Sequence, residues 1–159
     1  MKFYRSIATA FGSGYFPVAP GTAGSIVGTV LLFCLNLALG FGNVGEIPVL
    51  FIDALAILFM IFLGFHSIKK VHQVWPHDDN RIVIDEVIGV WIASFALPVK
   101  WYYYLFALVF FRLFDIFKPF GIRTIDKMHS NWSVIFDDVL AGVYASITLW
   151  IGLFFYSLI

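Results

Sequence analysis

The sequence predicts an all-α membrane protein, a polytopic helical bundle with about five spans that follow an N-terminal interfacial or re-entrant segment. Three observations lead to this fold class. Hydrophobic residues make up 61% of the 159 residues and charged residues only 13%, against roughly 45–50% and about 25% in soluble proteins. The apolar residues are collected into five long runs. The chain also holds 19 Phe, 7 Tyr and 5 Trp, and aromatic side chains are common at membrane interfaces.

The length is typical of one domain, which we expect to cover residues 1–159. Residues 1–23 are interrupted by Pro17 and Pro20, so they are expected to lie at the membrane interface or to re-enter the membrane. The five apolar runs cover residues 24–41, 49–65, 82–97, 101–117 and 134–159. Runs of about 17–25 residues fit a hydrocarbon core of roughly 30 Å at helical rise. The run over 82–97 is the shortest, and a tilted or partly interfacial helix fits it as well.

Charged residues indicate the orientation. Basic side chains gather at the N-terminus and in the polar segments 66–81 and 118–133, whereas the intervening turns hold only Lys100. By the positive-inside rule the basic side is cytoplasmic, which predicts a multi-pass protein with its polar segments inside the cell. The formal net charge of zero argues against a general nucleic-acid binder. Cys34 is the single cysteine, so there is no disulfide framework.

Four polar clusters stand at the cytoplasmic ends of the predicted helices. They are Gly21–Ser25, Asp85–Glu86, Arg112 with Asp115 and Lys118, and Asp137–Asp138. Because all four are predicted at the same membrane depth, side chains from different helices can meet there.

The two pairs of acids point to a metal. Residues 82–89 align without gaps on residues 134–141, so that Asp85–Glu86 fall on Asp137–Asp138. An acid inside or at the edge of a membrane segment is costly, and by default it is functional. Four carboxylates at one level suit Mg²⁺, which takes carboxylate ligands together with substrate phosphate oxygens. The alternative is that each pair only complements the positive end of a helix dipole.

Basic and small residues add a pattern suited to phosphate. Arg112, Asp115 and Lys118 follow each other at intervals of three residues, which places them on one side of a helix. Arg112 can present a fork to phosphate and Lys118 a point charge. The alternative is a local ion pair of Arg112 with Asp115 beside a snorkelling Lys118. Gly21–Ser25 could bring backbone amides close to an anion, although a plain helix start explains this segment too.

Three further groups are weaker candidates. His77, Asp78 and Asp79 could assist a metal or a proton relay, but a solvated loop explains them better. Arg123 could grip a second phosphate or a lipid head group. Asp53 is expected near the opposite membrane face as a structural or interfacial acid.

Four motifs occur together and in order along the chain: Pro20–Ser25, Ile82–Gly89, Phe111–Pro119 and Asp137–Gly142. This set resembles the phosphatidylglycerophosphatase A family of bacterial membrane lipid phosphatases, and the resemblance covers nearly the whole chain. It implies an all-helical enzyme of the bacterial cytoplasmic (inner) membrane. The implied reaction is the Mg²⁺-dependent hydrolysis of phosphatidylglycerophosphate to phosphatidylglycerol and phosphate in phospholipid biosynthesis.

The resemblance also implies the roles of individual residues. The motif residues that carry over are Thr22, Asp85, Glu86, Arg112, Asp115, Lys118, Asp137 and Asp138. The expected Mg²⁺ ligands are Asp85, Glu86, Asp137 and Asp138. Asp115 is expected as a further ligand or an orienting acid, and the phosphoryl oxygens are expected to bind Arg112 and Lys118, with Thr22 and Arg123. Attack on phosphorus by water and by a carboxylate both stay open. The chain departs from the family pattern at 119–123, although Arg123 is retained, and at 129–132, which includes His129.

The expected partners are a phospholipid substrate and the membrane, without nucleic acid, and a homo-oligomer stays open. Two other functions fit parts of the pattern. An ion or proton carrier would need polar residues across the membrane. Beyond Gly89 and Gly142 the third and fifth runs offer only Ser94, Ser146, Thr148 and Ser157, and this bunching at one face favours catalysis. A membrane assembly subunit would use the charges for interhelical ion pairs.

Overall fold

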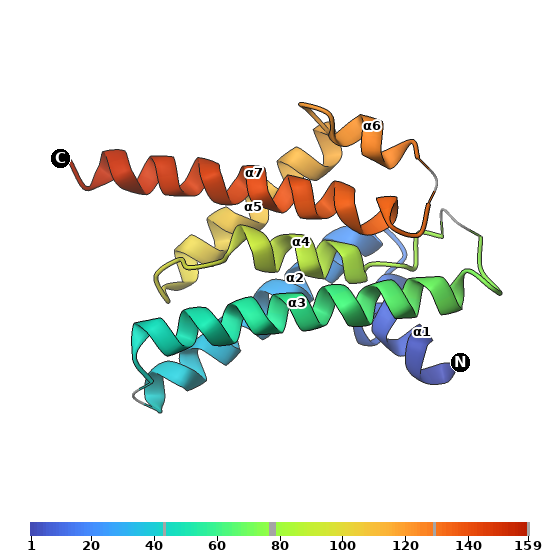
Figure 1. The fold of residues 1–159 in the computed structure, drawn as a ribbon, viewed down its shortest axis with the longest axis horizontal. Coiled ribbons are helices and arrows are strands. Elements are labelled where there is room, and N and C mark those ends of the chain that lie inside the picture. The colour runs from blue at the N-terminus through green and yellow to red at the C-terminus, as the bar shows by residue number, and fades with distance from the viewer. Residues whose placement is uncertain (43, 77–78, 129, 159) are drawn as a thin grey trace.

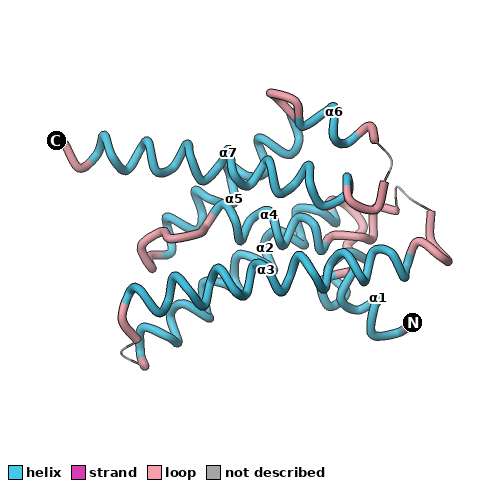
Figure 2. The backbone as a smooth tube through the Cα atoms, viewed as in Figure 1, coloured by secondary structure: helices cyan, strands magenta, loops and turns pink. Residues whose placement is uncertain are grey.

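The computed structural model describes residues 1–42, 44–76, 79–128 and 130–158, and this part of the chain is helical with no strand. The helices are α1 (Lys2–Ala8), the 3₁₀ helix η1 (Ala10–Tyr15), α2 (Pro20–Phe41), α3 (Glu46–Val71), α4 (Ile84–Ala93), α5 (Trp101–Phe117), α6 (Ile122–Asp126) and α7 (Ser133–Tyr156). Figure 1 shows their arrangement, and Figure 2 distinguishes the helices from the loops that connect them. The predicted all-α class is confirmed.

Three helices of the described chain are long and apolar enough to cross a membrane. They are α2, α3 and α7, with 22, 26 and 24 residues. The predicted membrane protein is confirmed at this level. With 10 residues, α4 is only about 15 Å long at helical rise, half of a hydrocarbon core. The count of five spans therefore stays a prediction.

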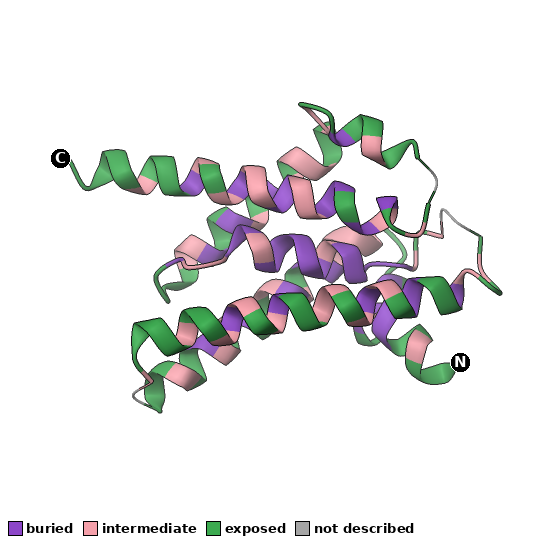
Figure 3. Ribbon diagram, viewed as in Figure 1, coloured by how far each residue is buried: buried purple, intermediate pink, exposed green. Residues whose placement is uncertain are grey.

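The short helix α4 is the centre of the bundle. It lies between α3 and α7, with α2 and α5 behind it (Figure 1). Eight of its ten residues are buried, whereas α3 and α7 have large exposed parts (Figure 3). A helix that is apolar on all sides needs such a complete cover. The exposed parts of its neighbours carry large apolar side chains such as Phe51, Phe59 and Phe154, which suits contact with lipid.

Two glycines bring α4 and α7 together. A Cβ atom on Gly142 would collide with the carbonyl oxygen of Gly89, and a Cβ atom on Gly89 would lie 2.9 Å from the carbonyl oxygen of Asp138. Small residues allow this close backbone approach between membrane helices. Since Gly89 lies one turn after Asp85 and Gly142 one turn after Asp138, the contact also places these two acids side by side.

Replacing Gly142 with Ala is therefore expected to destabilise the protein. The added methyl group has no space, and overpacking of this kind costs about 1–3 kcal/mol. Gly152→Ala is the matched control, because a Cβ atom at Gly152 meets nothing within 4 Å and Ala favours a helix over Gly by roughly 1 kcal/mol. Thermal unfolding in detergent measures both variants. Equal midpoints for the two variants would contradict the tight contact.

The N-terminal segment supports the loop that enters α4. The amide of Val83 donates a hydrogen bond to the carbonyl oxygen of Ala8 over 2.8 Å. Arg5 and Arg81 both lie over the ring of Trp75, at 5.5 and 4.2 Å from its centroid. This basic and aromatic packing is typical of a membrane interface, and it holds the start of α4 in place.

Candidate active site

A polar cavity of about 440 Å³ lies where the predicted clusters meet. Its walls come from the N-terminal ends of α2, α4 and α7, the C-terminal end of α5, α6 and the loop before α4. The lining residues include Pro20, Gly21, Thr22, Asp79, Asn80, Asp85, Glu86, Arg112, Asp115, Lys118, Asp126, Ser133, Asp137 and Asp138. All four sequence clusters therefore contribute to one site.

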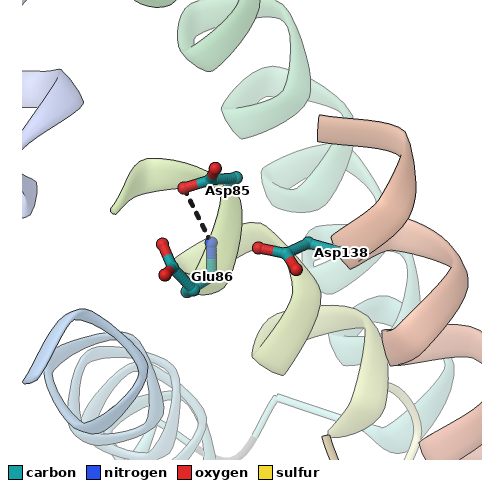
Figure 4. A group of neighbouring side chains, drawn as sticks. All are labelled: Asp85, Glu86 and Asp138. Carbon is teal, nitrogen blue, oxygen red and sulfur yellow. Dashed lines mark hydrogen bonds between the residues drawn. The ribbon is translucent and has the colours of Figure 1, made fainter. Parts of the chain in front are cut away.

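Three acids converge on one wall of this cavity. Asp85 and Glu86 come from α4 and Asp138 from α7 (Figure 4), and one oxygen of each lies within 4.8 Å of the others. Asp85 and Asp138 are only 9% and 4% exposed. The Oε2 atom of Glu86 is buried and has no hydrogen-bond partner among the described residues.

Such a group needs positive charge beside it. Carboxylates this close repel one another, and burial removes the water that would screen them. Oxygen ligands from two elements, with one oxygen unpartnered, fit a hard divalent cation. Asp85, Glu86 and Asp138 are thus the residues suited to hold a metal ion.

Asp137 has a different neighbour from the three acids. Its Oδ2 atom accepts a hydrogen bond of 2.9 Å from the Nζ atom of Lys118. Adjacent residues of a helix point about 100° apart, so Asp137 and Asp138 face different parts of the same cavity. Of the four acids predicted to bind a metal, three therefore lie together and the fourth, Asp137, is paired with Lys118.

Lys118 also contacts an acid that the sequence did not single out. Its Nζ atom donates to Oδ1 of Asp126 over 2.6 Å. Burial alone would lower the pKa of Lys118, but the hydrogen bonds to Asp126 and Asp137 raise it above its ordinary value. The ammonium group therefore stays charged in the cavity. In the sequence, Asp126 is one of several charged residues in a polar segment, eight residues after Lys118. Only its place on α6 in the structure identifies it as a partner of Lys118.

The backbone around Lys118 is unusual. Lys118 ends α5 with φ +47°, and Phe120 follows with φ +48°. Left-handed conformations are costly for residues other than glycine, and they persist where surrounding contacts demand them. The two hydrogen bonds of the Lys118 side chain provide such contacts.

Arg112 faces the three acids from α5. Its Nη1 atom lies 2.5 Å from Oδ2 of Asp115 and 3.8 Å from Oε1 of Glu86. The local ion pair considered from the sequence is therefore present. Within the part of the chain that the structure describes, the Nε atom of Arg112 is buried without a partner, so the guanidinium retains a donor beyond this pair.

The first turn of α2 closes the cavity beside these charges. Pro20 stands at the first helical position. A Cβ atom on Gly21 would collide with Oε1 of Glu86 and would lie 3.3 Å from Nη1 of Arg112. Glycine thus leaves room for the carboxylate of Glu86, which a methyl group here would force to move. Thr22 follows it in the cavity wall, where the first amides of a helix are suited to an anion.

The remaining candidates lie elsewhere or have other partners. Arg123 is exposed on α6 and is not part of the cavity wall. His77, Asp78 and His129 lie outside the described residues. The sequence favoured a solvated position for Asp79, but this residue lines the cavity. The hydrogen bond from the Arg81 side chain holds the pKa of Asp79 below its ordinary value.

Asp53 is far from this site along α3. It is buried, and its Oδ2 atom accepts a hydrogen bond of 3.1 Å from Nδ2 of Asn36, which also lies 2.9 Å from the hydroxyl of Tyr104. This network joins α2, α3 and α5, in agreement with a structural acid.

Known proteins match the chain over most of its length. A model of the phosphatidylglycerophosphatase A family matches residues 6–153. A phosphatidylglycerophosphatase A of Haemophilus influenzae is 39% identical over 146 residues, which cover 90% of this chain and 84% of that protein. Its counterpart in Escherichia coli is 33% identical over 153 residues, 94% of this chain and 83% of that protein.

A third relative has a different name. A protein of Bacteroides thetaiotaomicron, provisionally named phosphatidylinositol-3-phosphatase, is 38% identical over 146 residues, which cover 90% of this chain and 89% of that protein. No solved structure matches the chain. The chain therefore belongs to the phosphatidylglycerophosphatase A family and is a phosphatase, as its motifs predicted.

Proposed function

We propose that this protein hydrolyses the terminal phosphate monoester of phosphatidylglycerophosphate, giving phosphatidylglycerol and inorganic phosphate. One observation carries the proposal. In a single cavity at the ends of membrane helices, the acids Asp85, Glu86 and Asp138 face the cations Arg112 and Lys118. A phosphate group can bridge the two sides, through the cations directly and through a metal ion held by the acids.

The residues divide between metal and phosphate. Asp85, Glu86 and Asp138 would hold Mg²⁺, with Asp137 as the fourth predicted ligand. When bound, Mg²⁺ neutralises charge on the phosphoryl oxygens and lowers the pKa of a bound water. Arg112 and Lys118 bind the phosphoryl oxygens, assisted by Thr22, whereas Arg123, also predicted from the sequence, stands outside the cavity wall. Fixed cations of this kind stabilise the charge that develops in the transition state.

The acids next to the cations position them. Asp115 holds the guanidinium of Arg112, and Asp137 together with Asp126 holds the ammonium of Lys118. Preorganised donors lose little free energy to reorientation during the reaction. Attack on phosphorus then comes from water, or from a carboxylate in an aspartyl-phosphate route.

The membrane setting is part of the same proposal. The site lies at the cytoplasmic interface of the bacterial inner membrane in a single domain. In this setting α4 enters the membrane from the site and α5 returns to it, beside the crossings of α2, α3 and α7. The head group enters the cavity while the acyl chains stay in the bilayer. The carrier alternative is less suited, because α4 continues from the acids with the buried apolar residues Val87, Ile88 and Val90.

The direct test is phosphate release by the purified protein in detergent. With phosphatidylglycerophosphate and Mg²⁺ we expect turnover, and with excess EDTA we expect its loss, because the acid group would be without its cation. Re-addition of Mg²⁺ is the control that the fold survives. No release with any divalent metal would overturn the proposal.

A second substrate is suggested by the Bacteroides relative. Phosphatidylinositol 3-phosphate also carries a phosphate monoester on a lipid head group, although on a bulkier ring. The same assay, run with both lipids at equal mole fraction, compares kcat/KM. We expect phosphatidylglycerophosphate to be preferred, and the opposite order would assign the activity of that relative to this chain.

A further inference from the structure

An apolar groove of about 240 Å³ lies between α2 and α5. The two helices run antiparallel, since Gly21 approaches Arg112 at one end and the rings of Phe33 and Tyr104 meet at 5.1 Å further along. The groove is lined by Ile26, Thr29, Val30, Phe33, Trp101, Tyr104, Leu105 and Leu108.

On α2 the groove and the cavity share one face of the helix. Thr22 lines the cavity, and Ile26, Val30 and Phe33 line the groove. These residues follow Thr22 by four, eight and eleven positions, and such spacing places side chains in one stripe. The stripe changes from polar to apolar as it leaves the cavity.

On α5 the same pattern runs in the opposite direction. Arg112 lines the cavity, and Leu108, Leu105 and Trp101 precede it by four, seven and eleven positions in the groove wall. Each stripe is roughly 16 Å long at helical rise. Both walls of the groove therefore begin at residues of the proposed phosphate site.

The groove is open on its outer side. Ile26, Val30 and Leu105 are 46%, 54% and 46% exposed, and in a membrane this surface meets lipid. Its floor is closed by the edge-to-face contact of Phe33 with Tyr104. A flexible apolar chain can thus enter from the bilayer without crossing the bundle.

Another apolar groove of the bundle is separated from the site by aromatic contacts. It lies between α3 and α7, with a volume of about 420 Å³, and Leu58 and Ile147 are among its residues. Toward the cavity, Phe65 of α3 stacks on Trp132 at 3.8 Å. Between α5 and α7, the ring of Phe114 packs against the ring of Tyr144, with 5.9 Å between the ring centroids.

We propose that the groove between α2 and α5 holds one acyl chain of the phospholipid substrate while its head group occupies the cavity. This inference rests on the proposed function. Two observations favour this occupant. Both stripes continue from residues of the phosphate site, and the lining of the groove is apolar. Because lipid tails are as apolar as the groove, the gain comes from packing of the chain against the groove side chains, and the seated chain orients the head group.

The test fills the groove and compares two substrates. In Val30→Trp and Leu105→Trp the indole takes the place of the acyl chain. We expect kcat/KM for diacyl phosphatidylglycerophosphate to fall roughly tenfold, because the head group loses the orientation that the seated chain gives it. For the deacylated head group, glycerophosphoglycerophosphate, we expect wild-type kcat/KM. Leu58→Trp, in the groove between α3 and α7, is the matched control and should match wild type on both substrates.

Each outcome is informative. A loss shared equally by both substrates, or no loss on either, overturns the acyl-chain site. If the wild type releases phosphate from neither substrate, the proposed function fails instead. The chain site is then decided by photo-crosslinking of phosphatidylglycerol with a diazirine in one acyl chain. Labelling concentrated on residues 26–33 and 101–108, and reduced by Val30→Trp, supports the site; equal labelling of α3 and α7 overturns it.

Discussion

Replacing Asp138 with Asn is expected to lower kcat for phosphate release by on the order of 10³-fold. Asp138 is the member of the three-acid group that comes from α7, with an oxygen within 4.8 Å of those of Asp85 and Glu86. Asparagine keeps the shape but removes the negative charge that a divalent cation needs. Phosphate release and the Mg²⁺ concentration for half-maximal activity measure the effect, and we expect the latter to rise.

The control for this variant is an acid at the other end of the bundle. Glu46→Gln, in the first turn of α3, should retain wild-type turnover and Mg²⁺ dependence. The thermal unfolding midpoint of Asp138→Asn should stay close to that of the wild type, because neutralising one of three crowded acids relieves repulsion. Full turnover by Asp138→Asn would reject the metal-ligand role and leave the fold unaffected.

Replacing Arg112 with Ala is expected to lower kcat/KM by on the order of 10²–10³-fold. The change removes the cation that lies against Asp115 and Glu86, so the phosphate loses a partner and the acids lose their counter-charge. Arg112→Lys keeps the charge but not the planar fork. We expect it to recover part of the activity, with a raised KM.

Arg123→Ala tests whether Arg123 binds phosphate, as the sequence predicted, or stays outside the site, as the geometry indicates. Arg123 is exposed and lies outside the cavity wall, so its loss should leave kcat/KM within about threefold of wild type, as for a rim charge. A loss as large as that of Arg112→Ala would show that Arg123 joins the site with substrate bound.

For Arg112 itself, equal activity of Arg112→Ala and wild type would contradict its role in phosphate binding.

Much of the site could be predicted from the sequence because its motifs are local. The acids at Asp85–Glu86 and Asp137–Asp138 open apolar helices, and Arg112, Asp115 and Lys118 share a helix face by spacing alone. Charge in the loops placed all of them on one side of the membrane. The structure brings these residues to one cavity.

The details that depend on neighbouring helices could not be predicted. The division between Asp138, which joins Asp85 and Glu86, and Asp137, which binds Lys118, depends on how α7 is rotated against α4. Both acids have the same sequence context, and only the close contact of Gly89 with Gly142 sets that rotation. Asp126 reaches Lys118 because the chain makes a left-handed turn after α5. The pattern of apolar residues in the sequence does not indicate this turn.

The sequence by itself determined the helical class, the membrane setting, the family and the residues that carry charge at one face. These properties depend on composition, periodicity and short motifs, which act over a few helical turns. Only the tertiary structure decided the length and central place of α4, the grouping of three acids, and the groove between α2 and α5. Those properties arise from contacts between helices that are distant in the sequence. The shapes of the helix surfaces, and not the local sequence pattern, determine which helices pack together.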